Sequence, residues 1–261
     1  ADIIFSGAGL PLDLPSYLRE DSTTKLVPIV SSARAARVIC EKWKANYDYL
    51  PDALVVEGPK AGGHLGYKRE QIDNADYSLE RIVPEVVSEV GRYEELYGRR
   101  IPVIAAGGLY TGEDIYRIMR LGATGVQLGS KFVTTEECDA SPTFKQTYID
   151  SSKDDIEIIA SPVGMPGRAI GGEFIRRVKE GLMRPKKCPF HCIKTCDYTK
   201  SPYCIIMALY NAAKGNLSKG YAFCGANAYM SKKITSVRET IESLKSEFAA
   251  ACRRNGQTAV L

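Results

Sequence analysis

Five short apolar runs, each followed by a stretch with helical periodicity, constrain the fold of this chain more than any other feature. None of the runs alternates polar with apolar residues, which is the pattern of strands buried on both faces. Strands of that kind, repeating in strand-then-helix order, predict a parallel α/β sheet or barrel. The runs cover residues 2–6, 26–30, 53–56, 103–106 and 125–128.

Two of the intervening helices carry start signals. Ser32 precedes a stretch with helical periodicity, and its side chain can cap the free backbone N–H groups of the first turn. Thr111 and Asp114 have the spacing of a capping box at the start of another such helix. Both caps support the interpretation of the chain as repeated β/α units.

The pattern changes after about residue 180, where a basic run at 184–187 precedes a group of cysteines. An apolar segment follows at 203–213, and a final amphipathic helix is expected at about 234–254. We therefore expect two domains, a β/α barrel portion over residues 1–182 and a Cys-containing helical extension over residues 183–261.

Charge and hydropathy argue against several classes of protein. The 261 residues include 35 Lys and Arg against 31 Asp and Glu, a formal net charge of +4, with no basic stripe that would indicate nucleic-acid binding. No window approaches 18 consecutive apolar residues, and the N-terminus lacks the pattern of a secretory signal. A chain of this length does not need disulfides as staples. We expect a cytoplasmic protein that binds neither nucleic acid nor membrane.

Two successive strand ends are rich in small residues. The run from Pro102 ends in Gly107 and Gly108, and about twenty residues later a second run ends in Gly129 and Ser130. In a (β/α)8 barrel the loops after the last two strands bind a phosphate through backbone N–H groups, and glycine lets the anion approach closely. Either dipeptide alone also fits an ordinary turn, but the two in tandem favour a phosphate site.

His64 is one of two histidines in the chain and lies on the loop that leaves an earlier strand. The end of that strand would place it at the mouth of a barrel, between glycines that give no side-chain cover. Imidazole, with a pKa of ~6.5, can take or give a proton at neutral pH. A structural histidine would normally have an apolar frame, so the pattern favours a general acid or base.

Four segments together resemble the nitronate monooxygenase family, formerly called 2-nitropropane dioxygenases. They are AGGHLG at 61–66, VIAAGG at 103–108, GVQLGSKF at 125–132 and SPVGMPGR at 161–168. The related flavin-dependent enoyl-acyl-carrier-protein reductases share the first three. The resemblance covers about residues 1–180 and implies an FMN-dependent (β/α)8 barrel, a TIM-barrel fold, of which strands four to eight lie in this chain.

The resemblance also implies roles for single residues. Gly108 and the segment Gln127 to Ser130 would hold the FMN phosphate, Gly66 would lie along the cofactor, and His64 would be the catalytic histidine. The substrate would be an anionic alkyl nitronate, which molecular oxygen helps convert to a carbonyl compound and nitrite. The flavin would carry the electron chemistry, while His64 would assist with the proton or stabilise the anion. Residues 7–11 look like a strand end of the family that leaves room for substrate.

The chain departs from the family pattern at its start. By the resemblance, three strands precede the one that begins here at residue 2, so about three β/α units of a barrel are missing. Five strands cannot close a barrel with the normal tilt and stagger, and an open edge invites association. We expect an N-terminal segment or a second chain to complete the barrel by pairing in parallel with the first strand.

Four closely spaced cysteines form a candidate metal site. Four thiolates are enough for a zinc ion or an iron–sulfur cluster, and His191 adds another potential ligand. The spacing matches neither the usual C-x2-C pairs nor a ferredoxin run, so reduced structural thiols and a redox disulfide stay open as alternatives. The four are Cys188, Cys192, Cys196 and Cys204.

Several functions remain open at this stage. Nitronate oxidation and the NAD(P)H-dependent reduction of enoyl thioesters would use the same phosphate site and histidine. An alternative of another class is a non-catalytic part of a split-barrel assembly. We expect FMN as the resident cofactor, since no Gly-x-Gly-x-x-Gly dinucleotide loop follows the first strand.

Overall fold

The computed structural model of the protein describes residues 1–192 and 196–257. The chain divides into two compact units. The first comprises residues 1–59, 66–128 and the chain from Leu244 onward, and the second comprises residues 60–65 and 129–243. These units do not follow the expected boundary between residues 182 and 183, which stays a prediction. Among the described residues, no helix combines the length and hydrophobicity that crossing a membrane requires.

The first unit is built on a five-stranded parallel sheet in the order β1-β2-β3-β5-β6. Each parallel strand therefore lies beside the next parallel strand along the chain, which is the winding of a (β/α) barrel and not of a doubly wound sheet. The predicted α/β fold of the TIM-barrel type is confirmed, and so are the five predicted strands. They span Ile3–Ser6, Lys25–Val30, Leu54–Glu57, Val103–Ala106 and Gly125–Gln127.

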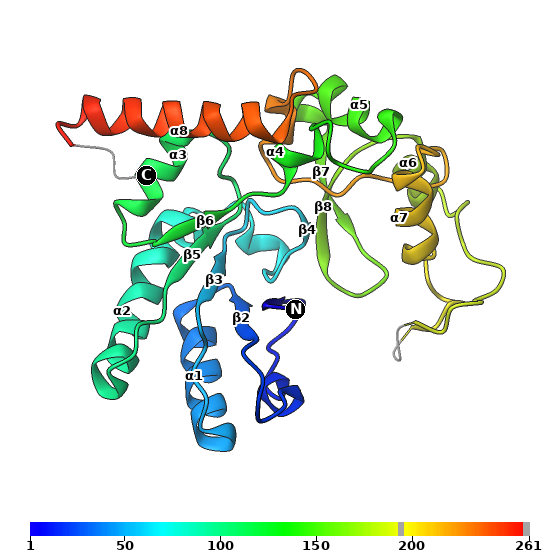
Figure 1. Cartoon of the computed structure of the whole chain (residues 1–261). Helices are drawn as coiled ribbons and strands as arrows, with labels where there is room; N and C mark the ends of the chain where they lie inside the picture. Colours follow the sequence, from blue (N-terminus) through cyan, green and yellow to red (C-terminus); the bar gives the residue numbers. More distant parts are fainter. Residues whose placement is uncertain (193–195, 258–261) are drawn as a thin grey trace. The chain divides into compact units, whose positions relative to one another are not determined.

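Helices α1 (Ala33–Tyr47) and α2 (Leu79–Tyr97) pack against each other and against the sheet of the first unit (Figure 1). As predicted, the Ser32 hydroxyl caps α1 by accepting a hydrogen bond from the Ala35 amide at 3.2 Å. Strands β2, β3 and β5 contribute residues to the core from both of their faces, as the lack of alternation predicted. The prediction is wrong for β1, which is largely exposed, and for β6, which has no buried residue. The largest fully buried side chains here include Trp43, Leu26, Ile39, Leu54, Val55, Val56 and Ile101.

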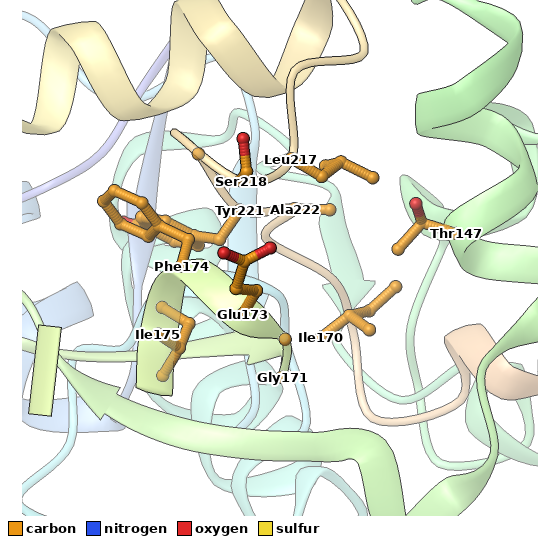
Figure 2. A pocket seen from close by; sticks show the side chains of 12 residues that line it. Thr147, Ile170, Gly171, Glu173, Phe174, Ile175, Leu217, Ser218, Tyr221 and Ala222 are labelled. Carbon is orange, nitrogen blue, oxygen red and sulfur yellow. The ribbon is translucent and has the colours of Figure 1, made fainter. Parts of the chain in front are cut away.

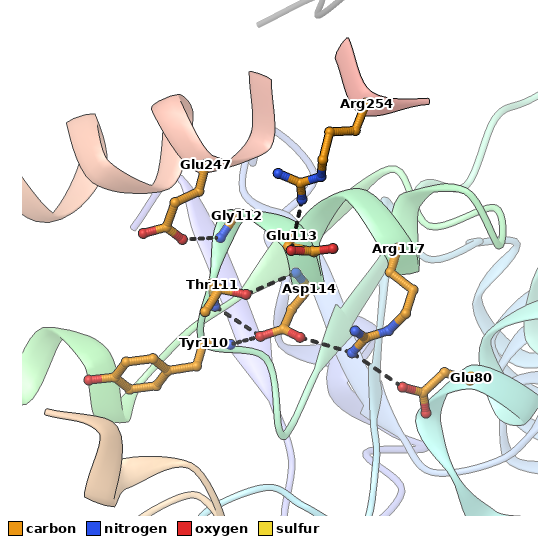
Figure 3. Close-up of polar contacts among 9 residues, drawn as sticks. All are labelled: Glu80, Tyr110, Thr111, Gly112, Glu113, Asp114, Arg117, Glu247 and Arg254. Carbon is orange, nitrogen blue, oxygen red and sulfur yellow. Dashed lines mark hydrogen bonds and ion pairs between the residues drawn. The ribbon is translucent and has the colours of Figure 1, made fainter. Parts of the chain in front are cut away.

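Helix α3 (Gly112–Met119) begins with the predicted capping box (Figure 3). The Thr111 hydroxyl accepts from the Asp114 amide at 3.1 Å, and the Asp114 carboxylate accepts from the amides of Thr111 at 2.9 Å and Tyr110 at 3.0 Å. These bonds satisfy backbone groups that a helix start would leave unpaired.

The second half of α8 (Val237–Arg254) packs on α3 within the first unit. The Glu247 carboxylate accepts from the Gly112 amide at 2.7 Å, and Arg254 pairs with Glu113 at 2.9 Å (Figure 3). The helix begins three residues later than expected, because Ser236 and Glu239 form a capping box. The Ser236 hydroxyl accepts from the Glu239 amide at 3.1 Å, and the Glu239 carboxylate accepts from the Ser236 amide at 3.0 Å.

The second unit is built on a three-stranded antiparallel sheet in the order β4-β8-β7. Its strands are β4 (Gly63–His64), β7 (Ile156–Ala160) and β8 (Pro166–Ile170), and its helices are α4 (Ser130–Val133), α5 (Pro142–Asp150), α6 (Glu173–Lys179) and α7 (Ile205–Ala213). Its core includes a group of rings from Phe174, Tyr203 and Tyr221. Short 3-10 helices of the chain lie at Leu14–Tyr17, Arg69–Gln71, Ala75–Tyr77, Lys153–Asp155 and Ala228–Met230.

Candidate active site

The carboxyl ends of the parallel strands form one edge of the first unit. Glu57 of β3 pairs in register with Ala106 of β5, which pairs in turn with Gln127 of β6. Gly107 and Gly108 follow directly, with φ angles of 95° and 79°. Residues with a Cβ rarely adopt this conformation, so the paired glycines are a requirement of this strand end. The edge therefore brings Gly107, Gly108 and Gln127 to neighbouring strand ends.

Gly66, which was also predicted to bind the cofactor, lies near the end of β2 in the same unit. A Cβ at this position would lie 2.7 Å from the Ser31 hydroxyl oxygen. The next residue, Tyr67, is buried and donates a hydrogen bond to the Glu57 carbonyl oxygen at 2.7 Å. These contacts tie the segment after His64 to the ends of β2 and β3.

Glu57 is a candidate functional residue that the sequence analysis missed. Burial raises the pKa of its carboxyl group to about 7, so the group changes charge near neutral pH. Groups with a strongly shifted pKa are concentrated at functional sites. The signal in the sequence was an acidic residue that directly ends an apolar strand, Leu54–Glu57.

His64 lies on β4 of the second unit and is half-buried. Its Nε2 atom is 2.7 Å from the Ser161 hydroxyl oxygen, and its ring meets the Phe223 ring edge to face, with centroids 5.0 Å apart. Burial lowers the pKa of the imidazole, so the ring is neutral at pH 7. The expectation that no side chain covers His64 is therefore corrected, because Phe223, distant in sequence, packs against it.

The backbone around His64 is held by close contacts. A Cβ on Gly62 would lie 2.5 Å from the Cys224 carbonyl carbon, so only glycine allows this approach. The buried Arg168 guanidinium donates to the Ala61 carbonyl oxygen at 2.8 Å. Both contacts fix the position of the Ala61-Gly62-Gly63-His64 segment within the second unit.

Ser161 connects His64 to buried tyrosines. Its hydroxyl oxygen accepts from the Val163 amide at 3.4 Å and also interacts with the Tyr203 hydroxyl. The Tyr203 and Tyr221 hydroxyls are 3.1 Å apart. Burial raises the pKa of both phenols, so both keep their protons at neutral pH. The imidazole therefore belongs to a neutral hydrogen-bonded group, and neither Ser161 nor Phe223 was predicted to contact it.

Gly129 and Ser130 belong to the second unit. Nothing lies within 4 Å of a Cβ built on Gly129, so the space beside it is open. The Ser130 hydroxyl oxygen accepts from the Gly225 amide at 2.7 Å, which leaves its own proton to donate. These properties suit an anion site.

The candidate metal ligands Cys188, Cys192, Cys196 and Cys204 all line one small pocket of the second unit. The pKa of the Cys196 thiol is raised, by desolvation first and then by the other three thiols. Within the described part of the chain, however, no three His, Cys, Asp or Glu side chains are arranged to hold a metal ion.

A separate cavity of about 150 Å³ lies in the second unit (Figure 2). It is lined by residues of α5, of the end of β8 and the start of α6, and of the segment 217–222. Thr147 and Phe174 lie on opposite sides of it. Its lining is mainly apolar, and the Glu173 carboxylate at the cavity pairs with Arg177 at 3.9 Å. We assign no ligand to this cavity.

Sequence comparison relates the chain to oxidoreductases. The sequence model of a family described as nitronate monooxygenase matches residues 1–247. A probable nitronate monooxygenase of Staphylococcus saprophyticus is 33% identical over 138 residues, which are 52% of this chain and 36% of that protein. The chain is also 28% identical, over 156 residues, to a dehydrogenase of Mycobacterium tuberculosis that acts on (3aS,4S,5R,7aS)-5-hydroxy-7a-methyl-1-oxo-octahydro-1H-indene-4-carboxyl-CoA. This match covers 60% of this chain and 38% of that protein. The chain thus spans little more than a third of these relatives.

Solved structures show the same fold over nearly the whole chain. FabK from Thermotoga maritima matches with a TM-score of 0.73 and 26% identity, over 97% of this chain and 70% of that chain. A nitroalkane oxidase from Streptomyces ansochromogenes matches with a TM-score of 0.70 and 23% identity, over 97% of this chain and 65% of that chain. At that identity the second match is a likeness of fold.

Proposed function

The chain belongs to the nitronate monooxygenase family, and we propose that it is part of an FMN-dependent oxidoreductase that oxidises alkyl nitronates. Molecular oxygen would be the co-substrate, and a carbonyl compound and nitrite the products. The observation that carries the proposal is His64, a neutral imidazole oriented by Ser161 and Phe223 on the segment that carries the family resemblance.

The residues proposed for FMN fit a phosphate group. Gly107 and Gly108 have backbone conformations that favour glycine, and Gly129 has open space where a side chain would be. Ser130 retains a hydroxyl proton to donate. We propose that these residues, with Gly66 and Gln127, hold the cofactor. When bound, FMN would supply the electron chemistry of the reaction.

His64 would manage the proton and the negative charge of the substrate. A neutral imidazole carries one N–H donor and one acceptor nitrogen. It can therefore donate a hydrogen bond to a nitronate oxygen, or take a proton from a substrate carbon. The contact with Ser161 fixes the ring orientation, and Phe223 shields the ring from water, which strengthens either interaction.

The test is to measure the absorbance spectrum of the purified protein and then its reaction with an alkyl nitronate. We expect flavin bands, FMN on release, and nitrite formation that depends on nitronate and oxygen but needs no nicotinamide. Failure to bind added FMN would contradict the proposal and favour a non-catalytic subunit.

The second candidate function is the reduction of enoyl thioesters by NADH or NADPH. It would use the same proposed FMN residues and the same histidine, so the fold does not separate it from nitronate oxidation. Under anaerobic conditions, bleaching of the flavin by NADH or NADPH without nitronate would support this function against the first.

A further inference from the structure

The cysteines of this chain fall into different environments. Cys40, Cys224 and Cys252 are buried and serve as small apolar core residues. Cys192 and Cys196 are exposed and Cys188 and Cys204 are half-buried, yet all four line the same pocket. Exposed free thiols are prone to oxidation and are uncommon without a purpose. Their gathering at one pocket calls for a ligand.

The segment that carries these four thiols has little structure of its own in its described residues. Between the end of α6 at Lys179 and the start of α7 at Ile205, residues 180–192 and 196–204 form turns and bends but no helix or strand. Irregular segments of this length are uncommon in compact domains unless something fixes them. In small irregular modules, a metal held by thiolates is a frequent means of fixing the chain.

The surroundings of the pocket favour negatively charged sulfur. Lys187 lines it, and Cys204 is the N-cap residue of the nine-residue helix α7 (Ile205–Ala213). Helix N-termini and lysine ammonium groups both stabilise thiolates. Thiolates, not thiols, are the form that binds metals.

We propose that Cys188, Cys192, Cys196 and Cys204 form a tetrathiolate site for a soft metal centre, either one zinc ion or an iron–sulfur cluster. Both centres take four thiolates, and the four cysteines line one pocket. Among the described residues no three of these side chains already surround a metal ion, so binding would require the four sulfurs to approach one another within the pocket.

The test is to purify the protein under nitrogen and to measure zinc, iron and acid-labile sulfide per chain. A zinc site predicts about one zinc, and a cubane cluster predicts about four iron and four sulfide. Outer-shell partners alone change metal affinity by about 10–100-fold, so the double variant Cys192→Ser, Cys196→Ser should lose at least about tenfold in metal affinity and contain less metal than the wild type. Cys138→Ser, a half-buried cysteine away from the pocket, is the matched control and should keep its metal.

A second measurement covers the event that the double variant does not fold. Metal-loaded and chelator-treated wild-type protein are alkylated with iodoacetamide, and the extent of alkylation of each cysteine is measured by mass spectrometry of the peptides. The centre should protect the four pocket thiols but not Cys138. Absence of metal after both anaerobic purification and reconstitution with zinc or with iron and sulfide would overturn the proposal, and so would equal metal in the double variant. FMN content is measured on the same samples, so failure of the flavin proposal is seen separately.

Discussion

At the scale of single residues, the imidazole of His64 is the group on which the proposed chemistry depends. Replacing His64 with Ala should lower kcat by ~10²-fold or more, the usual effect of losing a positioned proton-transfer group, and leave FMN content nearly unchanged. Steady-state kinetics and released flavin measure the two quantities. Unchanged turnover would refute the role.

The pH dependence tests the environment of the same ring. Because burial lowers the pKa of His64, the neutral form persists below pH ~6.5, and the acid limb of kcat/KM should lie below that value. Phe223→Ala exposes the ring and should move the limb up toward ~6.5. A limb that does not move would show that the ring of Phe223 does not set the imidazole's environment.

The buried carboxyl of Glu57 makes a prediction about stability. Its pKa in the folded protein is about 7, above the ordinary 4.5, so the folded state binds more protons between these values. Stability should therefore fall as pH rises from about 4.5 to 7 and then level off, with a total effect of up to about 3 kcal/mol. Glu57→Gln should remove this fall. In urea unfolding at pH 5 to 8, the free energy of unfolding of the variant should therefore rise relative to that of the wild type as pH increases. Parallel curves for the two proteins would contradict the assignment.

At the scale of secondary structure, the contact of α3 with α8 depends on a glycine. A Cβ on Gly112 would lie 2.3 Å from the Leu244 carbonyl oxygen and 2.4 Å from the Phe248 amide nitrogen, both backbone atoms. Gly112→Ala should therefore lower the free energy of unfolding by about 1–3 kcal/mol, the usual cost of overpacking. Gly91→Ala, in α2 with nothing within 4 Å, should instead raise it by about 0.5–1 kcal/mol. Thermal unfolding of both variants measures these changes. A loss of stability in both variants, or in neither, would count against the close contact of Gly112 with α8.

The sequence predicted the elements whose signals are local. Apolar runs gave the parallel strands, and Ser32 and Thr111 gave the helix starts. The hairpin of β7 and β8 was not predicted, because β8 begins with Pro166, contains Gly167 and buries the charged Arg168, all unfavourable in a strand. Its stability comes from contacts with residues far along the chain, such as the bond from Arg168 to Ala61.

At the scale of the whole molecule, the same limit applies to the candidate site. Motifs singled out His64 and the glycines of the strand ends. The contacts of His64 with Ser161 and Phe223 join residues 97 and 159 positions away, which no local pattern reports. The pKa of Glu57 likewise depends on burial by the folded chain, which is a property of tertiary structure.

The last prediction concerns how the cofactor stabilises the protein. A ligand that binds only the folded state stabilises it by about 2.7 kcal/mol at 100 times its Kd, and each kcal/mol raises Tm by about 2–4 °C for a protein of this size. If the glycine-rich strand ends hold the phosphate, FMN should raise Tm more than riboflavin does at equal concentration. Gly129→Asp adds a negative charge in open space and should reduce the shift with FMN but not with riboflavin. Gly125→Asp is the control, because Gly125 is equally open but lies at the opposite end of β6, and it should keep the wild-type difference in Tm shift between FMN and riboflavin. If riboflavin raises Tm as much as FMN does in the wild type, the proposed phosphate site is wrong.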